Sequence, residues 1–308
     1  MTRHAVLGAG PVGRAIVNSL AQRHIDAVVI TRSGTEVPGA TTRKVDVRDT
    51  NALAGALAGA DVVYQASQPE YHRWPQEFPA LQASVVNAAK RSGSTFVAVD
   101  NLYGYAPSTK PLTENLPQAS TTRKGRTRAD MWRALEAEWK AGNLKVTSGR
   151  ASDFFGPFAL GSQVGERFFG TLVAGKKAET FGDPNALHSY TYVVDFGEAL
   201  VRLALDERSL GRAWHVPNAS AITNGEFLAR VAAIAGVPAN SVKRTAFQLR
   251  LAGLFIPPAR EIIEMLYEFE HDFVVDHSAY AATFGDHATP LDESLAVTID
   301  WFRQHAKG

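Results

Sequence analysis

Cysteine is absent from the 308-residue sequence, and so is any long apolar run. Without cysteine the chain forms no disulfide, thiolate zinc site, iron–sulfur cluster or cysteine nucleophile. No uninterrupted apolar stretch approaches the roughly 18 residues that a membrane helix needs, so we expect no membrane partner. The first glycine, Gly8, comes too early for the apolar segment of a secretion signal. These features predict a folded cytoplasmic protein.

An excess of charge of one sign is also missing. The 32 Lys and Arg residues face 31 Asp and Glu residues, which gives a formal net charge of +1. We therefore expect no nucleic-acid partner. The sequence also lacks the Gly-x-Ser-x-Gly turn of serine hydrolases and the phosphate-binding loop of kinases and ATPases. His271, Asp272, Asp276 and His277 lie near one another, but the extended segment between them would point alternate side chains to opposite faces, so we expect no metal site.

Short apolar runs alternate with helical patterns through the first half of the chain. The expected strands are residues 5–7, 27–31, 44–47, 61–66, 95–99 and 144–147. The expected helices follow the first strand and then cover residues 51–58, 78–91 and 126–141. Strands separated by helices in this rhythm predict an α/β fold with a Rossmann-type, doubly wound parallel sheet.

The rhythm changes after residue 150. Glycines punctuate residues 156–182, and helical patterns follow at 193–207, 224–236, 246–255 and 259–269. We predict a dinucleotide-binding domain over residues 1–151, which a late strand near 213–217 rejoins. Residues 152–308 are predicted to form mainly a smaller, mostly helical substrate lobe, interleaved with the first domain. A cleft should lie between the two, outside the carboxyl ends of the strands.

A glycine-rich turn follows the first expected strand and opens the first expected helix. Gly8 permits the tight turn, Gly10 lets the backbone approach a pyrophosphate, and Gly13 lets helix and strand pack closely. Pro11 suits the first helical turn, and the free N–H groups beside Val12 suit phosphates. The alternative is a turn that serves packing only. In this context the turn predicts a dinucleotide site.

The end of the second expected strand bears on the choice between NAD and NADP. The residues there are Thr31, Arg32 and Ser33, without the carboxylate that would bind a ribose 2′-hydroxyl. Arginine and serine suit a 2′-phosphate, so NADP is favoured and NAD is the alternative. Asp46 either accepts a hydrogen bond from the adenine amino group or serves the turn before Asp49.

Several motifs occur in an order that is typical of one enzyme family. They are Gly8-Ala9-Gly10-Pro11-Val12-Gly13, Asp46-Val47-Arg48-Asp49, Tyr64-Gln65-Ala66-Ser67, Leu102-Tyr103-Gly104, Arg150-Ala151-Ser152-Asp153-Phe154-Phe155-Gly156-Pro157 and Tyr192-Val193-Val194-Asp195. The sequence from Val6 to about Asn218 thereby resembles the extended short-chain dehydrogenase/reductases, and more narrowly the NAD-dependent epimerase/dehydratase branch. The resemblance implies a nicotinamide cofactor, with Ala66 and Ser67 beside its ribose and nicotinamide.

The sequence departs from this family at the catalytic positions, which makes it an atypical member. Family members use a Ser or Thr just after the fifth strand and a Tyr-x-x-x-Lys pair that enters the next helix. Here Asp100 and Asn101 follow the fifth strand, and counting from Tyr103 puts Lys124 in the tyrosine slot and Arg128 in the lysine slot. Arg128 can anchor the ribose or the phosphates, but a guanidinium stays protonated and cannot shuttle protons.

Three residues could replace the missing tyrosine as the catalytic acid. Lys124 would release its proton more readily if other cations crowd it. Tyr103 lies near the end of the fifth strand and needs no such help to donate, and Asp100 lies at the strand tip. We rank Tyr103 slightly above Lys124.

Four cations gather at the start of the helix that contains Lys124. They are Arg123, Lys124, Arg126 and Arg128. Cations at a helix N-terminus are mildly unfavourable, so the cluster indicates an anionic partner, either a cofactor phosphate or an acidic substrate. The alternative is plain exposure to solvent.

The sequence thus predicts an NADP-dependent oxidoreductase or epimerase-like enzyme. It would transfer a hydride between NADP(H) and a small carbonyl or secondary alcohol, with a non-standard proton donor. The alternative is a catalytically silent NADP(H)-binding redox sensor or scaffold. Asp153, His188 and Tyr190 are weaker candidates for the cleft, for which packing is the competing role. A homodimer is compatible with either function.

Overall fold

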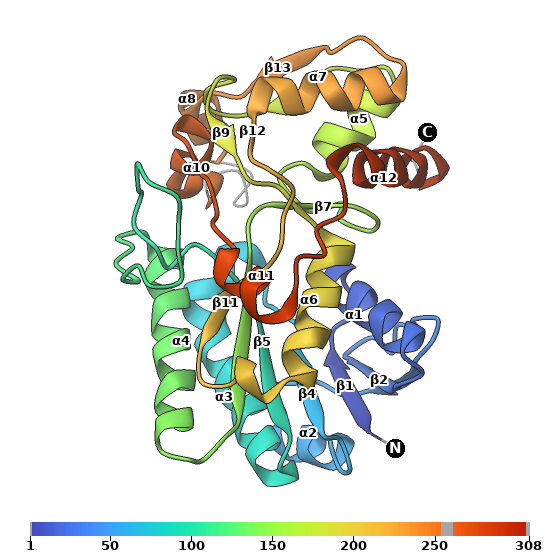
Figure 1. Cartoon of the computed structure of the whole chain (residues 1–308), viewed down its shortest axis with the longest axis vertical. Coiled ribbons are helices and arrows are strands. Elements are labelled where there is room, and N and C mark those ends of the chain that lie inside the picture. Colours follow the sequence, from blue (N-terminus) through green and yellow to red (C-terminus); the bar gives the residue numbers. More distant parts are fainter. Residues whose placement is uncertain (1, 254–260, 306–308) are drawn as a thin grey trace.

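A computed structural model describes residues 2–253 and 261–305 of the chain. Its centre is a seven-stranded sheet with the order β11-β6-β5-β4-β1-β2-β3, in which every neighbouring pair is parallel (Figure 1). The strands are β1 (Arg3–Leu7), β2 (Asp26–Thr31), β3 (Thr41–Lys44), β4 (Val62–Gln65), β5 (Thr95–Asn101), β6 (Val146–Ala151) and β11 (Ala213–His215). The predicted doubly wound parallel sheet is confirmed.

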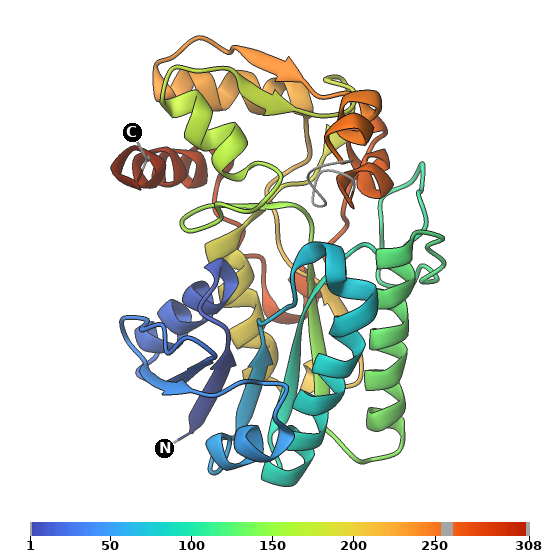
Figure 2. The same cartoon turned by 180° about the vertical axis from the view of Figure 1, so that it is seen from behind.

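Apart from the polar edge strand β3, the strands are buried on both faces of the sheet, and successive residues of a strand point into opposite layers. Ala5 and Leu7 belong to one apolar core, whereas Val6 between them belongs to the other. Helices α1 (Pro11–Gln22) and α6 (Val193–Leu205) cover one face (Figure 1), and α2 (Thr50–Ala56), α3 (Trp74–Ser92) and α4 (Arg123–Lys140) cover the other (Figure 2). This three-layer arrangement is the one that parallel strands require, because both faces must be shielded from water.

The winding of the chain reverses at β1. This strand pairs with β2 on one side and with β4 on the other. The carboxyl ends of β1 and β4 therefore lie side by side with no crossover above them, which is where open parallel sheets bind ligands.

Most of the later part of the chain packs above the carboxyl edge of the sheet, whereas α11 (Ser278–Phe284) lies beside β11 (Figure 1). Its strands are β7 (Phe154–Phe155), β8 (Ala178–Thr180), β9 (Leu187–His188), β10 (Thr191–Tyr192), β12 (Ile222–Thr223) and β13 (Ser241–Lys243). Its α-helices are α5 (Thr171–Val173), α7 (Asn224–Ala235), α8 (Ala246–Ala252), α10 (Tyr267–Glu270), α11 (Ser278–Phe284) and α12 (Leu291–His305), and Gly165–Gly170 is π-helical. Short 3-10 turns cover Tyr71–Arg73, Glu207–Ser209 and Ile263–Met265. An aromatic core, in which Phe169 stacks on Phe302 at 5.6 Å, holds this lobe together.

Several expected element boundaries are wrong. The third strand is Thr41–Lys44 rather than residues 44–47, because a polar edge strand pairs with β2 while Val47 packs into the core beyond it. Helix α3 begins four residues earlier than expected, with Pro75 in its first turn, and α4 begins at Arg123, because Thr122 accepts a hydrogen bond from the Gly125 N–H. The segment expected as one helix over 259–269 contains a 3-10 turn and α10 instead. The expected helix ends at residues 255 and 259 lie outside the described residues.

Candidate functional site

The glycine turn after β1 is explained at two positions by the fold itself. Gly8 has a φ of +111°, and a Cβ there would lie 3.0 Å from the carbonyl oxygen of Ala66. A Cβ on Gly13 would lie 2.1 Å from the carbonyl oxygen of Gly8. Gly10 differs, because it has an ordinary φ of −72° and no protein atom within 4 Å of the position of its missing Cβ. Packing does not require a glycine at position 10, so this open space suits a ligand that approaches the backbone.

The N-terminus of α1 is open as well. Gly10 is its N-cap and offers no side chain, Pro11 occupies the first turn, and that turn contains no acidic residue. The N–H groups of the first turn have no partner inside the helix, and the helix dipole favours an anion there. Pro11 and Val12 line the cleft described below, so this end of the helix faces the space that a pyrophosphate would fill.

The end of β2 forms one wall of the cleft. Thr31 Oγ1 accepts a hydrogen bond from the Thr35 N–H at 3.0 Å, and the Ser33 and Thr35 hydroxyls lie 2.6 Å apart. Arg32 is exposed and, within residues 2–253 and 261–305, makes no ion pair. Its guanidinium is therefore available to a phosphate.

Asp46 lies in the same wall, but Arg48 occupies its carboxylate. The Arg48 guanidinium donates to both carboxylate oxygens, at 3.0 and 2.6 Å, and holds the pKa of Asp46 at about 2. Asp49 caps α2 by accepting from the Asn51 and Ala52 N–H groups at 3.0 Å. Asp46 was expected either to bind the adenine amino group or to serve the turn before Asp49, and its contacts within the protein match the role in the turn.

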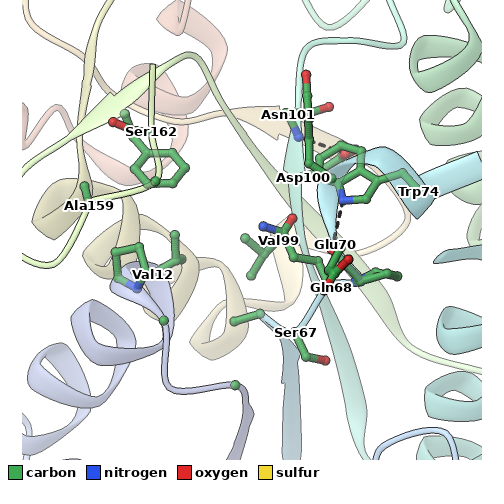
Figure 3. A pocket seen from close by; sticks show the side chains of 18 of the residues that line it. Val12, Ser67, Gln68, Glu70, Trp74, Val99, Asp100, Asn101, Ala159 and Ser162 are labelled. Atoms are coloured by element: carbon green, nitrogen blue, oxygen red, sulfur yellow. Dashed lines mark hydrogen bonds between the residues drawn. The ribbon is translucent and has the colours of Figure 1, made fainter. Parts of the chain in front are cut away.

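One cleft of about 880 Å³ runs from this wall past the glycine turn to the far end of the sheet edge. Figure 3 shows Val12, Ser67 and Ser162 around it, from α1, the loop after β4 and the loop after β7. Ala66 also lines it. The Oγ atoms of Ser67 and Ser162 and Oε1 of Gln163 are buried here without a hydrogen-bond partner among the described residues. Buried polar atoms are normally satisfied, so these orphans fit polar groups of a bound dinucleotide.

The carboxyl end of β5 contains a buried ion cluster. Asp100 accepts from Arg128 Nε at 2.8 Å and from Arg150 Nε at 3.2 Å, while Arg128 also donates to the Val99 carbonyl oxygen at 2.9 Å. Burial alone would raise the pKa of Asp100, but the two guanidinium groups hold it below its usual value. Asp100 is thus ionised, and its carboxylate oxygens already accept hydrogen bonds from the two arginines, which does not suit the predicted role of proton donor. It positions Arg128 in the wall of the cleft.

Tyr103 lines the cleft beside Tyr71. The Tyr71 hydroxyl donates to the Tyr103 hydroxyl at 3.2 Å, and Trp74 packs near both rings. Burial raises the pKa of Tyr103 well above its usual value, so the phenol keeps its proton. Because its oxygen accepts from Tyr71, the Tyr103 O–H is free to donate to a further group.

Lys124 has different neighbours from those expected. Its side chain is fully buried, and its Nζ donates to Glu261 and, at 2.8 Å, to Glu264. The expectation that cations crowd Lys124 is wrong, because carboxylates from the C-terminal lobe surround its ammonium and Arg123 also pairs with Glu261. Lys124 lies behind the ring of Tyr71, 4.4 Å from its centroid, and does not line the cleft.

The far end of the cleft contains groups that sequence reasoning ranked low or missed. Asp153 and Glu268 both line it. Burial and the nearby Asp153 carboxylate raise the pKa of Glu268 well above its usual value. His188 is fully buried behind Asp153, with its Nε2 at 3.2 Å from Asp153 Oδ2. Asp153 comes shortly after β6, and a polar residue at the carboxyl end of a parallel strand indicates a ligand site in the sequence. Nothing in the sequence around Glu268 indicates such a site.

Tyr190 serves packing rather than the cleft. Its ring stacks on Phe227 at 3.9 Å, and its hydroxyl donates to Asn224 at 2.7 Å. Among the described residues, no three His, Asp or Glu side chains are grouped as a metal site would require. Within the same residues, no helix combines the length and apolar character needed to cross a membrane.

The sheet order and the position of the cleft at its carboxyl edge together define a Rossmann-type fold. The sequence pattern described as "NAD dependent epimerase/dehydratase family" matches residues 5–216, and the chain belongs to this family. The resemblance read from the motifs is thereby confirmed. None of the curated proteins matches the sequence significantly.

Solved structures of several epimerases are similar to the whole chain. UDP-glucose 4-epimerase of Thermotoga maritima, solved with UDP-glucose, has a TM-score of 0.81 at 17% identity and covers 99% of this chain and 100% of its own. UDP-glucuronic acid 4-epimerase of Bacillus cereus, solved with UDP-glucuronic acid and NAD, gives 0.81 at 16% identity with the same coverage. UDP-glucose 4-epimerase of Thermus thermophilus, solved with NAD, gives 0.76 at 20% identity over 98% and 99% of the two chains. At these identities the likeness establishes the fold.

Proposed function

We propose that the protein transfers a hydride reversibly between NADP(H) and a small carbonyl or secondary alcohol, with Tyr103 as the proton donor. NAD(H) is the weaker, alternative cofactor in this proposal. One observation carries it: a single cleft is lined both by the glycine turn and by the buried phenol of Tyr103. A cofactor laid along the turn and a substrate held beside Tyr103 would share that space.

The charges around β2 support the preference for NADP(H). Thr31, Arg32 and Ser33, at the end of β2, include no carboxylate. The nearby Asp46 is neutralised by Arg48, and Arg32 has no ion-pair partner among the described residues. A 2′-phosphate would thus meet an available guanidinium and no free anion. A bound NADPH would supply the hydride. The free N–H groups of α1 would hold its pyrophosphate, and the unpartnered Ser67 and Ser162 hydroxyls would meet its polar groups.

Tyr103 has the protonation state that the reaction requires. When a hydride reaches the carbonyl carbon, the oxygen becomes an alkoxide that must receive a proton from a group within hydrogen-bond reach. The buried phenol retains its proton until such a strong base forms. Tyr71 donates to the phenol oxygen at 3.2 Å and would stabilise the phenolate that remains.

The test measures NADPH oxidation with a panel of small aldehydes and ketones in the whole chain. We expect Tyr103→Phe to lower turnover by about 100-fold or more and to leave the NADPH affinity unchanged. Lys124→Met is the comparison variant, since Lys124 does not line the cleft, and it should lower stability rather than the rate per folded molecule. Equal turnover in Tyr103→Phe and the native protein would refute the role of Tyr103.

A second candidate function is a catalytically silent NADP(H)-binding sensor or scaffold. The observation in its favour is that Asp100 and Lys124, two of the three candidate acids, are held in ion pairs. Tight NADPH binding without oxidation by any carbonyl compound of the panel would favour this function. Steady turnover that depends on Tyr103 would exclude it.

A further inference from the structure

The cations near the far end of the cleft are already paired. Arg128, the buried one, is bound to Asp100 and to the Val99 carbonyl oxygen. Arg73 pairs with Glu77 at 3.0 Å and Arg167 with Glu179 at 3.6 Å, and both side chains are about half exposed. The cationic cluster at the start of α4 is likewise neutralised at Arg123 and Lys124 by Glu261 and Glu264. Among the residues that the structure describes, the interior of this end therefore offers no free positive charge to a phosphate.

Its carboxyl groups, by contrast, have few partners. The Glu268 residue is 2% exposed, and its only side-chain hydrogen bond among the described residues comes from the Tyr267 hydroxyl at 3.5 Å. Asp153 faces His188, but Oδ2 of Asp153 and Nε2 of His188 do not have hydrogen-bond geometry with any group in the described part of the chain. Two buried carboxyl groups thus line one space, and within residues 2–253 and 261–305 no Lys or Arg side chain forms an ion pair with either of them.

His188 limits what Asp153 can do. Its Nδ1 lies 3.0 Å from the Glu268 carbonyl oxygen, which can only accept, so Nδ1 carries a proton. In a neutral ring Nε2 would then present a lone pair to the Asp153 carboxylate, which is repulsive. Phe269 stacks on the ring at 4.7 Å and fixes this arrangement.

An independent polar group lies at the same place. Ser152 is 6% exposed, lines the cleft, and its Oγ has no partner among the described residues. A hydroxyl so deeply buried normally has a hydrogen-bond partner. Together with the Tyr103 O–H, it provides neutral polar contacts beside the two carboxyl groups. The aromatic rings of Tyr71, Trp74 and Phe273 complete the lining.

We propose that this end of the cleft binds a substrate without phosphate, whose hydroxyl or ammonium groups donate hydrogen bonds to Asp153 and Glu268. The inference deepens the proposed function and rests on it for the reaction. Carboxyl groups accept from such donors, and aromatic rings favour an ammonium further, whereas a sugar diphosphate would bring its charge into a buried space where the described residues offer it no free cation. The substrate class therefore differs from the nucleotide sugars named for the similar structures.

The experiment uses three probes on one ring: D-glucosamine, D-glucose and D-glucose 1-phosphate. Their binding to the whole protein, saturated with NADP⁺, is measured by ligand-detected NMR titration. We expect glucose 1-phosphate to bind at least about tenfold more weakly than the tighter of the other two, a difference of about 1.4 kcal/mol. Glucosamine tighter than glucose assigns the site to ammonium groups, and equal affinities assign it to hydroxyl groups.

Charge variants link this order to the two carboxyl groups. Asp153→Asn combined with Glu268→Gln should reduce the discrimination against glucose 1-phosphate by about fivefold or more. Asp130→Asn, on the exposed face of α4, is the matched control and should leave it unchanged. The proposal is overturned if glucose 1-phosphate or UDP-glucose binds as tightly as glucosamine, if the three probes do not differ, or if the double variant keeps the native order.

Failure of this inference can be separated from failure of the proposed function. The probe titrations need no turnover and can be repeated without NADP⁺. Absent NADPH binding or oxidation would overturn the proposed function and leave the order of the probes intact. Tyr103-dependent oxidation together with tight UDP-glucose binding would overturn only the substrate class.

Discussion

The two ends of the cleft are built from different parts of the polypeptide. At the end beside Gly8, Gly10 and Gly13, where we propose that the dinucleotide binds and which we call the dinucleotide end, backbone dominates. It has two glycines that the fold requires, a third beside open space, and an uncapped helix N-terminus. At the far end, buried side chains dominate. The carboxyl groups show the contrast, since Arg48 holds the pKa of Asp46 at about 2 while burial raises that of Glu268 well above its usual value.

This difference separates the binding of a dinucleotide, which many proteins share, from the binding of a substrate, which differs between enzymes. A dinucleotide is the same molecule in every protein that binds it, and backbone geometry is sufficient to hold it. The substrate end must differ between enzymes on one fold, and side chains supply that difference. The predictions below test whether the two ends can be altered separately.

The largest effect on stability is expected at Asp100, which lies at the carboxyl end of β5 and accepts hydrogen bonds from Arg128 and Arg150. Asp100→Ala leaves Arg128 and Arg150 buried without their shared carboxylate, and should lower the free energy of unfolding by about 3–5 kcal/mol. Asp130→Ala removes an exposed ion pair on α4 and should cost less than about 1 kcal/mol. Urea unfolding of both variants measures the difference, and equal costs would contradict the buried cluster.

The next effect isolates the dinucleotide end. Arg32→Ala should weaken NADPH binding by about ten- to a hundredfold, or roughly 1.5–3 kcal/mol, and leave NADH binding unchanged. Calorimetric titration of both cofactors measures this. Arg126→Ala, an exposed arginine on α4, is the control. Equal losses for NADPH and NADH would show that Arg32 does not contact a 2′-phosphate.

A pair of glycine variants separates packing from ligand approach within one turn. Gly13→Ala places a methyl group against the Gly8 carbonyl oxygen and should lower the free energy of unfolding by about 1–3 kcal/mol. Gly10→Ala meets no protein atom, so it should cost less stability and still weaken dinucleotide binding. Thermal unfolding and cofactor titration of each variant test this. Unchanged NADPH affinity in Gly10→Ala would mean that the ligand does not approach that backbone.

The smallest effect concerns pH at the substrate end. Because burial raises the pKa of Glu268, the folded protein keeps a proton that the unfolded chain releases above about pH 4.5. Stability therefore falls as the pH rises above that value. Glu268→Gln cannot ionise, so its stability relative to the native protein should rise between about pH 5 and about pH 8. A constant difference over this range, measured by urea unfolding, would contradict the raised pKa.

The same contrast explains how far the sequence could predict the molecule. The apolar strands are local patterns, and the parallel sheet that they predicted is confirmed. The glycine turn is also a local pattern, and the dinucleotide site that it indicates stays a prediction. The edge strand β3 was misplaced because Thr41–Lys44 has no apolar alternation, and pairing with β2 decides its position. Local patterns do not specify which distant segments meet.

The far end of the cleft depends on contacts between segments that are distant in the sequence. Lys124 was placed by counting, yet its environment comes from Glu261 and Glu264, whose position depends on how the C-terminal lobe packs. Glu268 reaches the cleft from α10 for the same reason. The charge state of each of these groups depends on its tertiary contacts, and the sequence alone does not show which contacts form.

The edge strand β11 has a consequence for biosynthesis. It pairs with β6 only after the chain has passed through β7 to β10 and α6. While the ribosome is still adding those residues, β6 has an unpaired edge, which can recruit other strands and aggregate. A fragment that ends at Ala151 should therefore be poorly soluble. Extending the fragment through His215 supplies both β11 and α6, so we expect that extension to mark the earliest point at which a nascent chain resists proteolysis.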